Sequence, residues 1–378
     1  MPKGVDGRRR DIVARNDSGI ADVAVAKGDA EAADDHARDA RDDGEGDALL
    51  QGVGSGHEDE FTFAVGRSRV YADVARSFAE LSSNLMNFPI HAPVVFAALL
   101  TLLPFFFAAF WPRSIELAQG LPFALSILAP ALLCVPYAIV ASSYGQFRWA
   151  WFVLYLLLPI VICLLLYRAN LADPDQRGDW RDFLVLAVLG LAVDLRWFEP
   201  AWPPRLAVFN KMLLLDAGIY GFLVIRRLQH VGFDLRLRLA DLRIGARELG
   251  FYAPIAIALG LALGFLHLHA YIPSVPRVLM TWIFTFFFIA VPEELFFRGW
   301  MQNLMERRFG PRWALAVTAV LFGLSHFNKR AVHFNWRYVV LASLAGIFYG
   351  RAWRQQRRVG ASAITHASVD TLWSIWLR

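Results

Sequence analysis

The stretch FTFFFIAVPEELFFRGW, residues 284–300, decides the class of fold, because two adjacent glutamates and an arginine interrupt an otherwise apolar run. Apolar runs of about 20 residues are typical of helices that cross a bilayer. A charged side chain inside such a helix is costly in free energy, and by default it marks a functional site. The stretch therefore predicts a transmembrane helix that carries a polar site.

The rest of the chain has the composition of a polytopic membrane protein. Of its 378 residues, 57% are hydrophobic and the mean hydropathy is +0.41, whereas soluble globular proteins contain about 45–50% apolar residues. We expect an all-α membrane helix bundle with about nine transmembrane helices, within a range of about eight to ten. The predicted spans lie near 91–111, 121–141, 149–167, 206–225, 251–267, 279–298, 313–327, 337–353 and 360–377.

The orientation of these spans depends on one further apolar segment, residues 183–193. It is too short to cross a hydrocarbon core of about 30 Å at about 1.5 Å per residue. The positive-inside rule places three arginine-rich stretches in the cytoplasm, namely 226–248, 307–312 and 351–358. The N-terminus is then cytoplasmic if 183–193 does not cross the membrane and external if it does, and the sequence leaves both open.

The chain divides by composition into four parts. Residues 1–60 hold 16 acidic and 8 basic side chains and few aromatic ones, which predicts a disordered acidic leader. Residues 61–90 mix apolar and charged side chains, which predicts a segment at the membrane surface. Residues 91–250 are interpreted as an N-terminal transmembrane region with a cytoplasmic Arg-rich loop, and residues 251–378 as a catalytic transmembrane core.

Basic charge belongs to the membrane part of the chain. Residues 61–378 hold 17 acidic and 30 basic side chains. These basic groups are dispersed among apolar helices, so the expected partner is the lipid bilayer and not nucleic acid.

The two glutamates of the opening stretch are predicted to do different work. Neighbouring residues on a helix point about 100° apart, so Glu293 and Glu294 face different surroundings. Glu294 and Arg298 are four residues apart and can pair on one face. Glu293 is left outside this pair, and a carboxylate in an apolar setting suits a general base. The alternative interpretation is a helix end at which charged side chains reach the membrane interface.

Two further polar pairs lie on later helices. Phe322 and His326 occur in AVLFGLSHFNKR, and His366 and Asp370 occur in GASAITHASVDTLW. Taken alone, His326 reads as an interfacial histidine, and the i,i+4 pair of His366 and Asp370 reads as a structural hydrogen bond. Together with Glu293 they place groups able to activate water, or to stabilise an oxyanion, on three apolar helices. We therefore expect one polar cavity between these helices.

The predicted depth of His326 conflicts with this shared cavity. Glu293 is expected near the cytoplasmic end of its span, and His366 about one and a half turns into its own span. His326 lies near the far end of a span that begins around residue 313. For His326 to join the others, that helix must tilt or the 300–312 connection must dip into the membrane.

The three patterns, EELFFR, FGLSH and HASVD, resemble the motifs of the CAAX-protease and bacteriocin-processing (CPBP, or Abi) intramembrane endopeptidases. That family has Glu-Glu-x-x-x-Arg, Phe-x-x-x-His and His-x-x-x-Asn or Asp on successive membrane helices. The resemblance covers about 277–378. Asp370 stands where many relatives have asparagine, which leaves open whether residue 370 donates or accepts its hydrogen bond.

The resemblance implies hydrolysis of a peptide bond in a membrane-associated protein or peptide. Glu293 and His326 would activate water, and His366 and Asp370 would position it or stabilise the oxyanion. Glu294, Arg298 and Phe322 would support the site. No cofactor is favoured, but zinc or another divalent metal on Glu293, His326 and His366 stays open, because the family has been called metalloprotease.

The scarcity of lysine and the Ala/Asp-rich leader favour a bacterial inner membrane, with the active site toward the cytoplasm.

One alternative to a protease is a non-catalytic membrane scaffold or immunity factor, in which the cavity only binds a partner. Another is a small-solute transporter, for which Asn210, Lys211 and Asp216 in one span would form a polar path.

Overall fold

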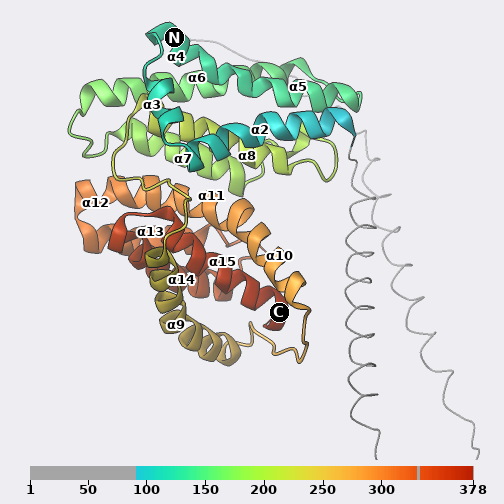
Figure 1. Ribbon diagram of the computed structural model, residues 1–378, viewed down its shortest axis with the longest axis vertical. Helices are drawn as coiled ribbons and strands as arrows, with labels where there is room; N and C mark the ends of the chain where they lie inside the picture. Colours follow the sequence, from blue (N-terminus) through green and yellow to red (C-terminus); the bar gives the residue numbers. More distant parts are fainter. Residues whose placement is uncertain (1–90, 330–332, 378) are drawn as a thin grey trace, which may run out of the picture. The chain divides into compact units, whose positions relative to one another are not determined.

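Every regular element that the structure describes is a helix, which confirms the predicted all-α class (Figure 1). The structure, a computed structural model, describes residues 91–329 and 333–377. The predicted disordered leader, 1–60, and the predicted surface segment, 61–90, lie outside the described residues.

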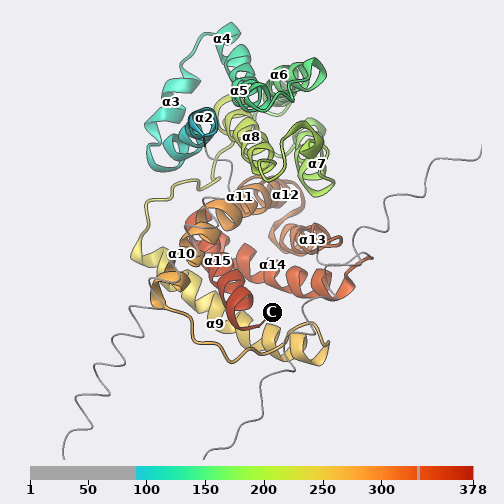
Figure 2. The ribbon, with the colours of Figure 1, turned by 90° about the vertical axis from the view of Figure 1, so that its right-hand side faces the viewer.

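The N-terminal helices begin the described chain. They are α2 (Ala92–Phe110), α3 (Arg113–Gln119), α4 (Phe123–Leu128), η1 (Ala129–Leu133), α5 (Cys134–Ser143), α6 (Trp149–Ala172), α7 (Trp180–Asp194), η2 (Glu199–Ala201), α8 (Val208–Ile219) and η3 (Tyr220–Ile225). Both views show these helices gathered together (Figures 1 and 2). Their apolar side chains form most of one large core, which follows from their composition.

A connector, residues 226–238, leads to the helices that carry the candidate site. These are α9 (Leu239–Ala262), α10 (Val275–Thr285), η4 (Phe286–Ala290), α11 (Val291–Glu294), η5 (Leu295–Gln302), α12 (Asn303–Phe309), α13 (Pro311–Leu324), α14 (Trp336–Gln356) and α15 (Val359–Trp376). Helix α15 packs against α9, α10 and α14, and α13 packs against α14 and α12. The C-terminal helices thus surround α15.

Six helical stretches are long and apolar enough to cross a membrane, namely 92–110, 123–143, 149–172, 208–225, 239–262 and 275–309. Helix α13 is apolar but shorter. Helices α14 and α15 form where spans were predicted, yet they are not among the six, because α14 carries several arginines and α15 alternates apolar with small polar residues. The chain is an integral membrane protein, and the count of about nine spans stays a prediction.

Two predicted boundaries near the site were wrong. The span expected at 251–267 is a helix at 239–262, which begins earlier because the Asp241 carboxylate accepts a hydrogen bond from the backbone N–H of Arg238. The second half of the predicted 226–248 loop is therefore helical. The span expected at 279–298 continues to Phe309 as one 35-residue helical stretch. Pro292 has no backbone N–H and so cannot donate the usual helical hydrogen bond, yet the helix does not end there. π-helical turns lie on both sides of Pro292 and accommodate the change in the hydrogen-bond pattern.

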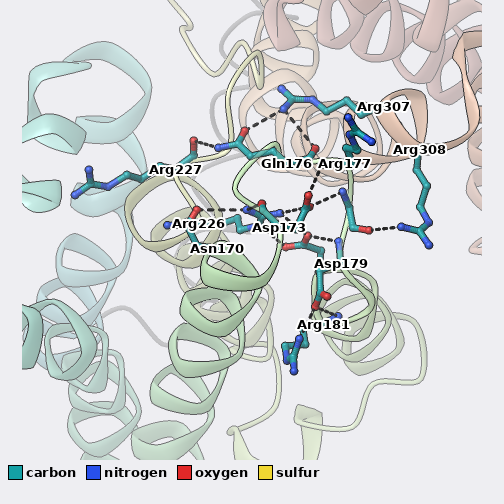
Figure 3. A network of polar contacts seen from close by, with 12 residues as sticks. Asn170, Asp173, Gln176, Arg177, Asp179, Arg181, Arg226, Arg227, Arg307 and Arg308 are labelled. Atoms are coloured by element: carbon teal, nitrogen blue, oxygen red, sulfur yellow. Dashed lines mark hydrogen bonds and ion pairs between the residues drawn. The ribbon is translucent and has the colours of Figure 1, made fainter.

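A network of buried charges ties the α6–α7 turn to the beginning of the connector (Figure 3). Arg226 is fully buried, and it donates to Asp182 at 2.9 Å and to Asp173 at 2.7 Å. Arg307 and Arg308 of α12 reach the same turn and donate to Gln176 Oε1 and to the Gly178 carbonyl, respectively. These arginines, which the positive-inside rule counts as loop charges, hold the N-terminal helices against α12.

The connector also docks onto the turn between α14 and α15 through Gly232. Gly232 has φ +74°, and its carbonyl accepts from Val359 N at 3.0 Å. A Cβ at this position would collide with the Arg357 carbonyl. We expect Gly232→Ala to lose more stability than the roughly 1 kcal/mol that a positive φ alone costs. The matched control is Gly145→Ala, since Gly145 has φ +65° and a Cβ there would meet nothing. Thermal unfolding of the two purified variants compares them, and equal losses would contradict the close docking.

The next residues of the connector predict a dependence of stability on pH. Arg236, which hydrogen-bonds to Asp234 at 2.9 Å, lowers the pKa of that carboxyl, and Arg358 lowers it further. A carboxyl with a lowered folded-state pKa stabilises the fold above its unfolded pKa of about 3.9, and this contribution is lost as the pH falls below that value. As the pH falls from about 5 to about 3, we expect the stability of Asp234→Asn to decrease less than the stability of wild type. Thermal midpoints across this range test it, with the exposed Asp175→Asn as control.

Candidate active site

The structure brings the candidate residues together from three helices. Glu293 and Glu294 lie on α11, followed by Arg298 on η5. Phe322 lies near the end of α13, and His326 follows that helix directly. His366 and Asp370 lie on α15, which packs against α11.

Glu294 lies at the centre of a buried charged group. Arg298 Nη1 donates to Glu294 Oε1 at 2.9 Å, and both side chains are 0% exposed. His366 Nδ1 lies 2.8 Å from the same oxygen. Since a carboxylate oxygen only accepts, the His366 nitrogen must donate. The predicted i,i+4 pair is thus present, and it also fixes the orientation of the histidine ring.

Aromatic rings pack against this charged group. The Arg298 guanidinium carbon lies 4.5 Å from the centroid of the Phe322 ring, and its Nη2 donates to the Gly346 carbonyl at 3.1 Å. Tyr349 stacks on His366 with ring centroids 4.6 Å apart. Phe322 thus contacts the buried arginine, which gives this motif residue a physical role.

Glu293 points away from the Glu294 group, as the helical angle predicts. Its Oε1 lies 3.8 Å from Lys329 Nζ, and its Oε2 lies 3.9 Å from His366 Nε2. Oε2 is buried and has no hydrogen-bond partner among the described residues. The side chain as a whole is 27% exposed. Glu293 is therefore held close to His366 but remains free to accept a hydrogen bond.

His366 joins the two glutamates to Asp370. Asp370 Oδ2 lies 3.6 Å from His366 Nε2, on the same side of the ring as Glu293. Both ring nitrogens therefore face carboxylate oxygens, and a proton on either nitrogen has an acceptor. The side chain of Asp370 is 29% exposed, while His366 is nearly completely buried. The arrangement makes His366 the shared contact of three carboxylates.

His326 reaches the site because the Glu293 helix is longer than predicted. The helix continues from Glu293 to Phe309, and α13 then packs back along it over a similar number of residues. His326 consequently returns to the side of α15, where it lines one cavity with His366 and Asp370. Its Nδ1 lies 2.9 Å from the Phe322 carbonyl and must donate there, so Nε2 of the neutral ring is an acceptor.

Two cavities lie at the site, and they share no lining residue. The smaller, of about 80 Å³, is lined by His326, His366 and Asp370 together with apolar side chains of α9 and α14. The larger, of about 340 Å³, lies on the Glu293 side. Its polar lining consists of Asp194, Arg196, Lys211, Glu293, Ser325, Asn328 and Lys329. The N-terminal helices α7 and α8 thus form one wall of the space in front of Glu293.

Sequence reasoning missed two residues that contact the site. Lys329 stands three residues after His326 in SHFNKR, and nothing in this spacing distinguishes it from an ordinary interfacial lysine. Tyr349 lies on α14 outside all three motifs. Its stacking on His366 depends on packing between helices, for which no spacing rule exists.

The described residues do not provide an arrangement for a metal ion. No group of three His, Cys, Asp or Glu side chains among them is placed to hold one. The Nδ1 atoms of His326 and His366 already contact the Phe322 carbonyl and Glu294, respectively. These contacts leave both Nε2 atoms available, but Glu293, His326 and His366 are not grouped as ligands of one ion in the described part of the chain.

The fold and the site together define an integral membrane protein with carboxylates and imidazoles gathered inside an apolar helix bundle. Residues 275–372 match a family model described as type II CAAX prenyl endopeptidase Rce1-like. The match confirms the resemblance to the CAAX-protease family over the part of the chain that carries every candidate site residue. A search of curated proteins and a search of solved structures gave no match.

Proposed function

We propose that the chain is an intramembrane endopeptidase that hydrolyses a peptide bond of a membrane-associated protein or peptide. The observation that supports it best is the meeting of Glu293 and His366 beside a cavity, with 3.9 Å between Glu293 Oε2 and His366 Nε2. The family match implies a CAAX-type intramembrane protease and supports the same activity.

Glu293 is the proposed general base. Its unpartnered Oε2 accepts a proton from the attacking water, whose oxygen then bonds to the carbonyl carbon of the substrate. His326 Nε2, an acceptor in the neutral ring, offers a second contact to this water. The proton passes to the leaving amine when the peptide C–N bond breaks.

His366 and Asp370 are the proposed partners of the tetrahedral intermediate. His366 Nε2 carries a proton toward the cavity and donates to the developing oxyanion, while Asp370 orients the ring. Glu294 and Arg298 hold His366 from the other side and do not touch the substrate. The mechanism is glutamate-dependent and needs no metal in this proposal.

The larger cavity is the proposed binding site for the substrate. Its walls are mostly apolar, and its cationic groups are Arg196, Lys211 and Lys329. The description of the matched family makes a peptide with a prenylated C-terminal motif the first substrate to test. We further propose nine spans, a bacterial inner membrane and a site that opens toward the cytoplasm.

The test is cleavage of a farnesylated peptide with a C-terminal CAAX motif by the purified full chain in lipid vesicles. Mass spectrometry of the products identifies the bond that breaks. We expect cleavage that is unchanged by 1,10-phenanthroline, because no step uses a metal. Loss of activity with the chelator, and its return with added zinc, would contradict the metal-free mechanism. No cleavage of prenylated or unprenylated peptides by wild type would favour a scaffold, an immunity factor or a transporter.

A further inference from the structure

A buried carboxylate in the N-terminal helices has no partner and no part in the proposed reaction. Asp216 of α8 is 3% exposed, and neither of its carboxylate oxygens has a hydrogen-bond partner among the described residues. Tyr220 stands four residues later, and its buried hydroxyl likewise has none. Residues four apart share a helix face, so the two polar groups point to the same side.

Both residues line a cavity of about 530 Å³ that is separate from the candidate active site. Its walls come from α2, α3, η1, α5, α8 and η3, and it shares no lining residue with the cavity at Glu293. The lining is strongly apolar, and Asp216 is its only charged residue. The lining residues Phe107 and Leu132 are 50% and 70% exposed, so the cavity reaches the outer face of helices that are candidate membrane spans.

The charge of this lining selects the ligand. A carboxylate buried without a partner is costly in free energy, and a cation with hydrogen-bond donors removes that cost. A phosphate or carboxylate head group would be repelled, because no Lys, Arg or His lines the cavity. An apolar tail suits the remaining walls and the access from the bilayer.

We propose that this cavity binds an amphiphile with a primary ammonium head group and a single alkyl chain. The ammonium donates to the carboxylate of Asp216 and to the hydroxyl oxygen of Tyr220. The alkyl chain lies along the apolar side chains of α2 and η1. The site does not depend on the proposed protease activity, because it shares no lining residue with the cavities at Glu293 and at His326 and His366.

The test uses native mass spectrometry of the full chain with dodecylamine as the probe and dodecanol and dodecanoate as matched chains. We expect one dodecylamine per chain, and binding of the alcohol and the acid at least about tenfold weaker, which corresponds to about 1.4 kcal/mol. Asp216→Asn, which keeps the shape of the side chain, should weaken the binding of dodecylamine by a similar factor. The control Asp175→Asn removes an exposed carboxylate and should bind as wild type does.

A second variant keeps the proposal testable if Asp216→Asn does not fold. Ala118→Trp places a bulky ring in the cavity while the carboxylate stays, and it should also lose dodecylamine binding. Equal binding of amine and alcohol by wild type would overturn the proposal, because it would show an apolar cavity without selection for charge. Undiminished binding in Asp216→Asn, or no binding in wild type, would overturn it as well.

Discussion

Glu293→Gln should abolish cleavage of a membrane peptide while the chain remains folded. The amide has the shape of the carboxylate, but it cannot take a proton from water, so the general-base contribution of about 10²–10⁴-fold is lost. We expect the fold to persist, because Glu293 Oε2 has no hydrogen-bond partner among the described residues and Oε1 loses only its 3.8 Å ion pair with Lys329. The measurement is the rate of peptide cleavage, alongside the thermal unfolding midpoint of the same preparation.

The control separates a lost base from a general effect of removing charge. Glu116→Gln removes an exposed carboxylate from α3, far along the chain from the site, and should keep the wild-type rate. A Glu293→Gln variant that cleaves at the wild-type rate would refute Glu293 as the base. If Glu293→Gln loses activity together with its folded state, Glu293→Asp replaces it. Aspartate keeps the negative charge, but its shorter side chain moves the carboxylate away from the attacking water.

Arg298→Met should cause a large loss of stability. Arg298 and Glu294 are both fully buried, and removing one partner of such a pair typically costs about 3–5 kcal/mol. Methionine fills much of the space, so the loss reports mainly the buried Glu294 carboxylate, which keeps only its contact with His366. The measurement is denaturant or thermal unfolding of the purified chain, followed by the fluorescence of its tryptophans.

A double variant distinguishes the charge from the packing. Glu294→Leu with Arg298→Met removes both charges, and we expect it to be more stable than Arg298→Met alone. Cleavage should stay low in the double variant, because His366 Nδ1 loses the carboxylate that orients its ring. A double variant whose loss equals the sum of the two single losses would show that the pair is not coupled.

Local features of the fold were predictable from the sequence, because they depend on neighbours along the chain. The i,i+4 spacing of Glu294 and Arg298 gave their pairing, and the angle between adjacent residues gave the separate surroundings of Glu293. Apolar runs also located the helices, since the membrane selects for length and hydropathy. The all-α class follows from the same runs.

Features that depend on packing between helices were not predictable. The opening stretch suggested a span that ends at residue 298, and only the wide turns around Pro292 carry the helix to Phe309. That extension decides where His326 and Lys329 return, so an error in one boundary concealed the 3.8 Å contact between Glu293 and Lys329. The burial of Arg226 was equally hidden, because its partners Asp173 and Asp182 are far away in sequence.

The continuous helical stretch from Val275 to Phe309 links the thickness of the bilayer to the geometry of the candidate site. Its 35 residues span about 50 Å, well beyond a hydrocarbon core of about 30 Å, so this rod must tilt or project from the membrane. Glu293 lies near the middle of this helical stretch, whereas His366 belongs to a separate helix. Because α15 packs against η4 and α11 of this stretch, we expect the tilt that a bilayer of given thickness imposes to affect the distance between Glu293 and His366.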